Sequence, residues 1–415
     1  MTALTTQKAD VARRSALSRA KTHVHPARMD LLNAMKLNLV AARSEGYRVW
    51  DMDGREFLDM DLRAGVYNLG HRHPQMVTAL AEALEYADMG FALFPGDQES
   101  ALAEKLTRSS GTQYAIFTPS GTEANDMAIR SARRFTGKRR IVSASQGYHG
   151  ASGLASAAGN PGFARSFVSD YPDEFTTVPV NDAGAIEAEL SKGDVAALIL
   201  EPVCNAAAYP TTPEGYWPAI RELCDSHGVV LIMDEIVTGL GRSGKVWGHQ
   251  AIGIQPDIVV TGKGLSGGIY PIAATLLSGA VGQWLAEDSS GYAGTFAGGE
   301  LACAVGSAAF DLSTSPETLE HANAMASKFR EGLEAIRRHR PIISDIRQFG
   351  FLFAVEFDRE GAGLALASHL FAKGVLTFPA VNAPSSLNLK LGHLVDQPFC
   401  HSMLERLDQA IGELA

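Results

Sequence analysis

The chain has 415 residues, of which 46% are hydrophobic and 20% are charged, a composition typical of soluble globular proteins. Its formal net charge of -10 disfavours nonspecific binding to nucleic acids or anionic membranes, because these carry charge of the same sign. The N-terminus lacks the apolar core of a secretory signal, and no apolar run approaches the ~20 residues of a membrane-spanning helix. We therefore expect a cytoplasmic protein that binds neither nucleic acid nor membrane.

Cysteine and histidine residues give no sign of a metal site. The four cysteines are widely spaced and form neither a CxxC pair nor a cluster with histidine, so we expect free thiols in a reducing cytoplasm. His71 and His73 are close in sequence, but no third ligand type is clustered beside them. We expect no bound metal.

The first part of the chain is expected to form a polar helix, a hairpin and two further helices. Residues 1 to about 30 are polar and weakly patterned, consistent with a short helix. Residues 47–59 alternate between apolar and polar side chains around an Asp-Gly pair, which predicts two strands joined by a tight turn. Helical spacing follows at residues 75–88 and 98–108.

From residue 114 the chain alternates between short apolar strands and amphipathic helices. This alternation, over about 200 residues, predicts an α/β protein with a doubly wound, mostly parallel sheet. The expected strands are residues 114–118, 139–143, 195–200, 229–233, 258–261 and 273–278. One expected helix ends near residue 135, and another spans residues 218–227.

From about residue 315 the pattern changes to long helices that flank a few strands. Residues 316–339 and 362–373 have helical spacing, strands are expected at 350–356 and 374–377, and a last helix begins at about 398. We interpret this region as a smaller α+β domain that the N-terminal hairpin joins. The predicted organisation is a segment of residues 1–65 that joins the small domain, a large cofactor-binding domain of residues 66–314 and a small domain of residues 315–415.

A stretch from Val229 to Pro271 carries the two residues on which the functional interpretation depends. The apolar run at its start ends at Asp234, which predicts a buried strand that delivers a carboxylate to the edge where open α/β sheets bind ligands. Lys263 follows among small residues, where a ligand can pack closely and form a Schiff base. These are the two protein groups that pyridoxal phosphate (PLP) most needs, although each residue alone is more simply a surface lysine or a strand-end acid.

Three further motifs are ambiguous by themselves. Ser120-Gly121-Thr122 lies at a strand-to-helix turn, where backbone N–H groups form either an anion site or an ordinary helix N-cap. Tyr148 between glycines is either a ring that stacks on a planar heterocycle or a packed aromatic side chain. Gly294-Thr295 offers a second hydroxyl that can face a phosphate.

Taken in order, these motifs resemble the class III (ω-type) aminotransferases of fold type I, the family of glutamate-1-semialdehyde aminomutase and of ornithine and 4-aminobutyrate aminotransferases. The resemblance extends over nearly the whole chain, and the run DE-x-x-TG-x-GR-x-G followed by the GK motif is its most specific part. It implies a fold type I transferase that binds PLP and works as a homodimer. The motifs that carry it are VWDMDGREFLDM, LGHRHP, SGTEAN, GYHG, EPV, LIMDEIVTGLGRSG, PDIVVTGKGLSGG and GTFAG.

The resemblance implies a role for each position of the site. Lys263 would hold PLP as an internal aldimine and shuttle the proton between the substrate Cα and C4′ of the cofactor, while Asp234 would keep the pyridine nitrogen protonated. Tyr148 would stack on one face of the ring, and Ile236 would cover the other. The other cofactor contacts that it implies are Ser120, Gly121 and Thr122 at the phosphate, Glu201 in the EPV motif, and Thr295, which would reach the phosphate of the neighbouring subunit.

The sequence departs from the family where the substrate is bound. Many members carry an arginine near the C-terminus that clamps a substrate carboxylate; here Lys390 stands at about that place, as an imperfect substitute or simply as a surface residue. Arg63 lies in the segment that lines the family's substrate pocket, and it is either an alternative carboxylate anchor or an outward-facing side chain. We expect the pocket around Arg63, Tyr67, Phe94 and Lys390 to determine the substrate.

The type of reaction is harder to predict, because aminotransfer, 1,2-amino shift, racemisation and decarboxylation all begin from the same cofactor complex. Ala64 and Tyr148 replace the Gln and Trp of the related decarboxylase, which disfavours decarboxylation. We predict an aminotransferase that moves an amino group between an amine or amino acid and a carbonyl acceptor. A 2,1-aminomutase of the glutamate-1-semialdehyde type or an amino-acid racemase is the alternative, since residues 204–208 lack an acid as in the aminomutase branch. The intact Lys263, Asp234 and Tyr148 disfavour a PLP-binding protein without turnover.

Overall fold

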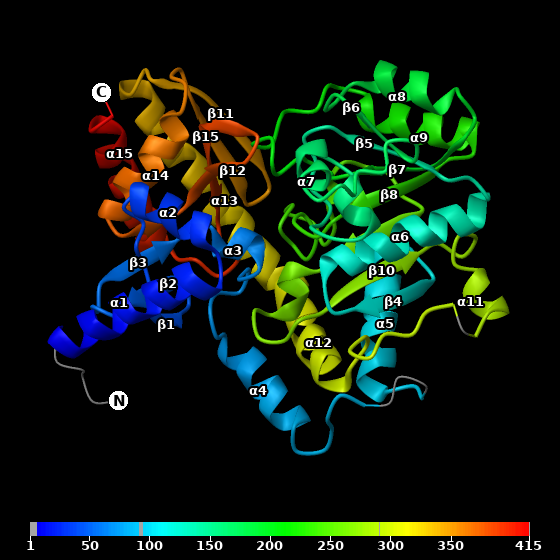
Figure 1. Ribbon diagram of the computed structural model, residues 1–415, viewed down its shortest axis with the longest axis horizontal. Helices are drawn as coiled ribbons and strands as arrows, with labels where there is room; N and C mark the ends of the chain where they lie inside the picture. The colour runs from blue at the N-terminus through cyan, green and yellow to red at the C-terminus, as the bar shows by residue number, and fades with distance from the viewer. Residues whose placement is uncertain (1–5, 91–93, 290, 415) are drawn as a thin grey trace.

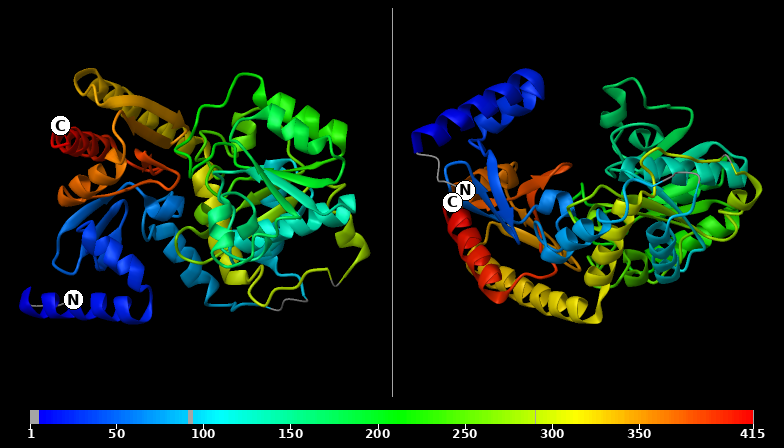
Figure 2. Two further views of the ribbon diagram at one scale, coloured as in Figure 1. Left: turned by 45° about the horizontal axis from the view of Figure 1, so that its top comes forward. Right: turned by 90° about the horizontal axis from the view of Figure 1, so that it is seen from below.

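The computed structural model describes residues 6–90, 94–289 and 291–414, which form a larger and a smaller part (Figure 1). The larger part is built on a seven-stranded sheet, and the smaller part contains two four-stranded sheets. The N-terminal strands lie beside the C-terminal strands and helices in the smaller part (Figures 1 and 2). Within the described ranges, no helix is long and apolar enough to cross a membrane.

The central sheet has the strand order β4-β10-β9-β8-β7-β5-β6. Only β10 runs against the other strands, since it pairs antiparallel with β4 and β9 while the remaining neighbours pair in parallel. The predicted α/β fold with a mostly parallel doubly wound sheet is therefore confirmed. The strands are β4 (Tyr114–Thr118), β5 (Arg140–Ala144), β6 (Phe175–Val178), β7 (Val195–Leu200), β8 (Val230–Asp234), β9 (Ile258–Thr261) and β10 (Ala273–Leu277).

Helices cover both faces of this sheet. In β8, Val230 and Ile232 pack on the face covered by α6, whereas Leu231 and Met233 pack on the face covered by α9, because successive side chains of a strand point to opposite sides. With both faces covered, the C-terminal edge of the sheet is left for ligands. The helices of this part are α4 (Pro74–Ala83), α5 (Asp97–Ser110), α6 (Gly121–Thr136), α7 (Pro161–Arg165), α8 (Ala183–Leu190), α9 (Tyr216–His227), α10 (Gly248–Ala251), α11 (Trp284–Glu287) and α12 (Glu300–Thr314), with 3₁₀ helices η1 (Leu154–Ala157) and η2 (Lys263–Ser266).

The smaller part joins the two ends of the chain. Strand β3 pairs in parallel with β13, and Leu58 and Met60 share a core with Phe353, Leu389 and Met403. The residue boundaries given above for the domains remain a prediction. The elements are α1 (Thr6–His23), α2 (Pro26–Ala34), β1 (Ala41–Glu45), β2 (Arg48–Asp51), β3 (Glu56–Asp59), α3 (Leu62–Gly65), α13 (Pro316–His339), β11 (Ile343–Phe349), β12 (Leu352–Phe357), α14 (Ala362–Ala372), β13 (Val375–Leu376), β14 (Phe378–Ala380), β15 (Ala383–Lys390) and α15 (Gln397–Gly412).

Local sequence signals were sufficient to predict where helix α13 begins. Ser315 caps it by accepting a hydrogen bond from the Thr318 N–H, and Pro316 occupies its first turn, so the helix begins where the sequence predicts. Helix α4, in contrast, ends at Ala83 rather than 88, because the Glu85 and Tyr86 N–H groups bond carbonyls only three residues back. Strands β1, β6, β11, β14 and β15 were not predicted; β11 and β15 have many polar residues.

A buried arginine joins the two parts of the chain. Arg242, in the turn between β8 and α10, is fully buried. Its Nη1 donates to the Leu391 carbonyl at 2.9 Å, and its Nη2 donates to Oδ1 of Asn68. Burial of the charge lowers the pKa of Arg242 to about 10. Segments around residues 68, 242 and 391 are thus held together by one guanidinium.

We expect Arg242→Met to destabilise the protein by about 3 kcal/mol, because the Leu391 carbonyl and the Asn68 amide would lose a charged donor in the interior. The urea midpoint of unfolding measures the effect. The control is Arg108→Met, which removes an exposed ion pair with Glu104 and should cost less than about 0.5 kcal/mol. Equal midpoints for the two variants would contradict this role of Arg242.

Candidate active site

Two adjoining cavities lie at the C-terminal edge of the central sheet and share Gly121 and Lys263. We call them the Asp234 cavity, of about 160 Å³, and the Arg63 cavity, of about 450 Å³. Lys263 therefore borders both cavities. Besides the shared residues, the Asp234 cavity is lined by Thr122, Tyr148, His149, Glu201, Asp234 and Ile236, and the Arg63 cavity by Arg63, Val66, Tyr67, Ser120, Ser266 and Tyr270.

Asp234 ends β8 and is held by a hydrogen-bond network. Its Oδ2 accepts from Asn125 Nδ2 at 2.9 Å and from His149 Nδ1 at 2.8 Å, while Oδ1 accepts from the Ile236 N–H at 3.1 Å. Asn125 Nδ2 also donates to the His149 carbonyl at 2.7 Å, so the three residues form one unit. The carboxylate is almost completely buried, and these contacts fix its orientation.

His149 and Asn125 are the site residues that sequence reasoning missed. Burial lowers the pKa of His149, but the hydrogen bond and the charge of Asp234 outweigh burial, so the net direction is upward. The pair therefore favours an imidazolium beside a carboxylate. Both residues lie within quoted motifs, SGTEAN and GYHG, and their polar side chains near a strand-end acid were the available signal.

The start of α6 supplies backbone donors to the Asp234 cavity. Ser120 caps the helix, because its Oγ accepts from the Glu123 N–H at 3.3 Å, so the N-cap alternative is confirmed. Gly121 and Thr122 form the first helical turn, where N–H groups have no intrahelical partner. A capped helix start can still bind an anion through these groups.

Tyr148 and Ile236 border the Asp234 cavity from two different loops. Tyr148 is 42% exposed, and its ring contacts that of Phe163 edge-on at a centroid distance of 5.4 Å. Its N–H donates to Glu201 Oε1 at 3.4 Å, which connects the loop after β5 with the end of β7. Ile236 follows Asp234 directly and reaches the same cavity.

Lys263 follows β9 and begins η2 with a left-handed backbone, at φ 44°. A non-glycine residue in this region stores strain that the surrounding structure must hold, as is frequent at functional sites. Burial lowers the pKa of its amine, although the charges of Asp234 and Glu201 oppose this effect. The amine is thus more readily neutral than that of a surface lysine.

The substrate candidates do not come together as the sequence analysis expected. Arg63 and Tyr67 line the same cavity as Lys263, and Arg63 is exposed. Lys390, in contrast, is only 4% exposed and lines neither cavity; its Nζ donates to Asp61 Oδ1 at 3.3 Å. The surface interpretation of Lys390 is therefore wrong, because the lysine lies at the end of β15 within the core of the smaller part.

Thr295 and Phe94 lie outside both cavities. Thr295 is exposed, before α12, and borders neither Lys263 nor Asp234 within the one described chain. Phe94 lines a separate hollow with Tyr86, Pro95 and Glu300. Phe94 is thus not part of the Arg63 cavity, contrary to expectation.

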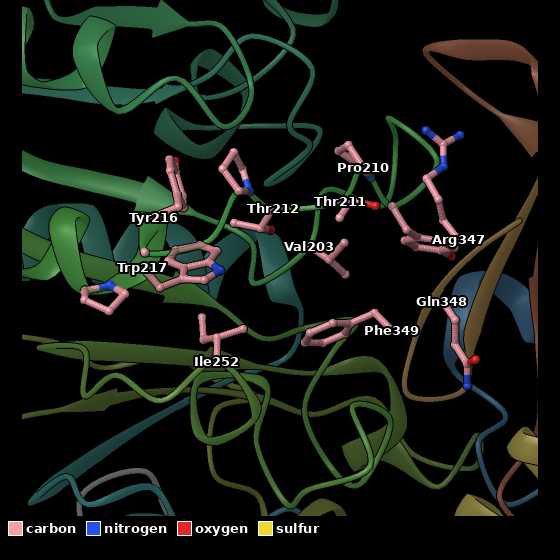
Figure 3. Close-up of a pocket in the computed structure, with 14 residues that line it drawn as sticks. Val203, Pro210, Thr211, Thr212, Tyr216, Trp217, Ile252, Arg347, Gln348 and Phe349 are labelled. Carbon is pink, nitrogen blue, oxygen red and sulfur yellow. The ribbon is translucent and has the colours of Figure 1, made fainter. Parts of the chain in front are cut away.

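A further cavity, of about 330 Å³, lies between the segment after β7 and strand β11 (Figure 3). Trp217 and Ile252 face it from the larger part, and Arg347 and Phe349 face it from the smaller part (Figure 3). None of the residues proposed from the sequence lines this cavity. It is therefore separate from the candidate active site.

The residues of the Asp234 cavity fit PLP. A Cβ on Gly121 would come within 2.6 Å of Ile236 Cδ1, and a Cβ on Gly150 within 2.8 Å of Thr122 Cγ2, so a larger residue at either position would displace a side chain that borders the cavity. A buried carboxylate, a helix start and an amine are together the groups that suit a protonated ring nitrogen, a phosphate and an aldehyde. Among the described residues, no cluster of three potential metal ligands was found.

Comparison with known proteins agrees with this geometry. Residues 32–411 match the family model described as aminotransferase class-III. An uncharacterized aminotransferase of Archaeoglobus fulgidus is 36% identical, covering 94% of this chain and 92% of the relative. Acetylornithine aminotransferase of Vibrio parahaemolyticus is 33% identical, covering 91% and 94%. The crystal structure of acetylornithine aminotransferase from Elizabethkingia anophelis aligns with a TM-score of 0.82 and 26% identity, covering 97% of this chain and 99% of that one.

Both the family model and the relatives extend over nearly the whole chain, including both parts of the fold. The chain therefore belongs to the class III aminotransferases and is a PLP-dependent aminotransferase of fold type I.

Proposed function

We propose that Lys263 attaches PLP covalently through Nζ and afterwards moves the proton at the substrate carbon that bears the amine. The observation that carries this proposal is the position of Lys263 at the junction of the two cavities. Bound PLP supplies an electron sink that weakens the bonds at that carbon. The lowered pKa of Lys263 supports its role as a base, because a neutral amine can accept a proton.

The other residues of the Asp234 cavity would hold the cofactor. Asp234, oriented by Asn125 and His149, would pair with the ring nitrogen and keep it protonated. Tyr148 and Ile236 would pack on the ring, and Ser120, Gly121 and Thr122 would bind the phosphate at the start of α6. Glu201 would support Tyr148 through the backbone hydrogen bond between them.

The Arg63 cavity would bind the substrate. Arg63 is an exposed cation in a cavity that also contains Lys263, so a carboxylate on the substrate can pair with it while the amine reaches Lys263. Tyr67 would form part of the wall. By analogy with relatives named acetylornithine aminotransferase, we propose a donor with a terminal amine and a carboxylate, such as N-acetylornithine.

The working unit would be a homodimer in the cytoplasm. Thr295 is exposed and lies outside both cavities of its own chain, so it is available to reach the phosphate in a second copy. The four cysteines are unpaired, which supports a reducing compartment.

We expect Lys263→Ala to abolish aminotransfer, with a loss of at least about 10³-fold, because it removes both the attachment point and the base. The PLP form is incubated with an amine panel, and release of a carbonyl product with lasting formation of pyridoxamine phosphate is measured. Lys373→Ala, far from the site at the end of α14, is the control. Substantial turnover by Lys263→Ala would overturn the mechanism, and an isomer formed without a second substrate would indicate an aminomutase.

We expect Arg63→Ala to raise the KM for N-acetylornithine about tenfold, because one exposed charge-assisted contact is lost. The KM for N-acetylputrescine, which lacks only the carboxylate, should change less than twofold. Arg72→Ala, which removes an exposed arginine that lines neither cavity, serves as the control. An unchanged KM for N-acetylornithine would refute the anchor.

Burial raises the pKa of Glu201 from its ordinary 4.5 to about 7. The pKa of Glu201 is higher in the folded than in the unfolded state. Protonated Glu201 therefore makes its full contribution to folding stability below pH 4.5, and this contribution is lost as the pH rises through about 7. The change corresponds to about 3 kcal/mol. We expect the unfolding free energy of cofactor-free Glu201→Gln, relative to wild type, to rise by about 2.5 kcal/mol between pH 5 and pH 8 in urea unfolding. Surface variant Glu187→Gln should show no such trend, and a flat difference for Glu201→Gln would contradict the expectation.

A further inference from the structure

The segment that carries Arg63 has an unusual backbone. Leu62, Arg63 and Ala64 all have left-handed φ angles, of 53°, 50° and 56°. Left-handed residues other than glycine normally occur singly, because the side chain crowds its own backbone. Three in succession persist only when other groups hold them in place. Two aspartates contact this turn, and one lysine contacts the second aspartate.

Asp59 and Asp61 bind the backbone of this turn from both ends. Asp59 Oδ1 accepts from the N–H groups of Asp61 at 3.0 Å and Leu62 at 2.8 Å. Asp61 Oδ2 accepts from the Ala64 N–H at 3.0 Å. Asp59 is itself held, since its Oδ2 accepts from His71 Nε2 at 2.8 Å. The far end of the turn also has backbone hydrogen bonds, from the Gly65 N–H to the Asp61 carbonyl and from the Val66 N–H to the Leu62 carbonyl. The second oxygen of Asp61, Oδ1, does not bond the turn, so its partner can help to orient the carboxylate.

That oxygen is the partner of Lys390. Lys390 is 4% exposed, and its Nζ donates to Asp61 Oδ1 at 3.3 Å. The backbone N–H of Lys390 donates to the Met60 carbonyl at 2.9 Å. Lys390 thus bonds the segment just before the turn through both its backbone and its side chain. Burial lowers the pKa of Lys390, but Tyr209 and Asp61 outweigh burial and raise it, so the amine stays charged.

Arg63 and Lys390 thus differ in what they can reach. Arg63 lines the cavity shared with Lys263 and is exposed, whereas Lys390 lines neither cavity and is already paired. A buried lysine that is neutralised by an aspartate is a poor ligand for a second carboxylate, because binding would have to break the first pair. Lys390 therefore contacts, through Asp61, the turn that carries Arg63.

We propose that Lys390 is a positioning residue, whose ion pair with Asp61 holds the left-handed turn of residues 62–64 and so directs Arg63 toward the carboxylate of the substrate. This inference rests on the function proposed above for Arg63. It differs from direct binding of the carboxylate by Lys390, and the two alternatives predict different effects of one substitution.

That substitution is Asp61→Asn, which keeps the shape of the side chain and its bond to the Ala64 N–H. If Lys390 bound the substrate itself, removing its partner would free the amine, and affinity for a carboxylate would improve or stay constant. If Lys390 positions Arg63, the loss of the pair loosens the turn and affinity falls. Lys390→Met removes the same pair from the other side and serves as the second variant.

The first measurement is amide hydrogen exchange of the PLP-loaded protein. We expect exchange in residues 59–67 to become at least tenfold faster in both Lys390→Met and Asp61→Asn, while β8 keeps the wild-type rate. Lys373→Met, which removes an ion pair with Glu413 elsewhere in the smaller part, is the control and should leave residues 59–67 unchanged. Wild-type exchange in residues 59–67 of both variants would overturn the positioning role.

The second measurement is the half-reaction of the PLP form with N-acetylornithine or N-acetylputrescine, followed by absorbance, which needs no acceptor. We expect both variants to raise the half-saturating concentration of N-acetylornithine five- to tenfold. The limiting rate, and the half-saturating concentration of N-acetylputrescine, should each change less than twofold. In an Arg63→Ala background, Lys390→Met should add less than twofold, because both act through one contact. A full additional effect, or tighter binding in Asp61→Asn, would overturn the proposal in favour of direct binding by Lys390.

The two proposals fail separately. If each donor has the same half-saturating concentration in Arg63→Ala as in the wild type, Arg63 does not anchor the carboxylate, whatever the exchange rates show. If Arg63→Ala weakens N-acetylornithine binding but Lys390→Met leaves both exchange and binding unchanged, the anchor stands and the positioning role is wrong.

Discussion

The site depends on one buried carboxylate and on the groups that compensate its charge. Asp234 ends a strand covered on both faces and is only 4% exposed, so protein groups supply most of the hydrogen bonds that its carboxylate needs. Asn125 from α6 and His149 from the loop after β5 provide these hydrogen bonds. The requirement brings the start of α6, the loop of Tyr148 and the segment of Ile236 together around one cavity.

The residues that line the two cavities are held in place by different parts of the fold. Residues around Asp234 lie at the ends of central strands, where packing on both faces leaves little freedom. Arg63, in contrast, lies in a strained turn supported by Asp61 and by Lys390 of β15. Cofactor chemistry would thus be built into the rigid sheet, while substrate preference would depend on how the smaller part holds one turn.

Much of the cofactor side could be predicted because its residues follow apolar strands. Carboxyl ends of parallel strands meet at one edge, so Asp234, Lys263, Glu201 and the Ser120 turn are brought close by topology alone. Asn125 and His149 were missed because a polar residue inside a helix or loop gives no sign of the partner that it will meet. Strands β11 and β15 were missed because their polar residues hide the apolar alternation.

The sequence by itself determined the α/β architecture, the family and the order of the residues around the Asp234 cavity. Hydrophobic periodicity and motifs at strand ends are local signals, and the parallel sheet converts them into neighbours. Only the tertiary structure decided the state of Lys390 and the backbone of the Arg63 turn. Burial and ion pairing of Lys390 depend on Asp61, which lies far away in the chain. The left-handed turn of residues 62–64 is held by the neighbouring Asp59 and Asp61, and Asp61 in turn contacts the distant Lys390.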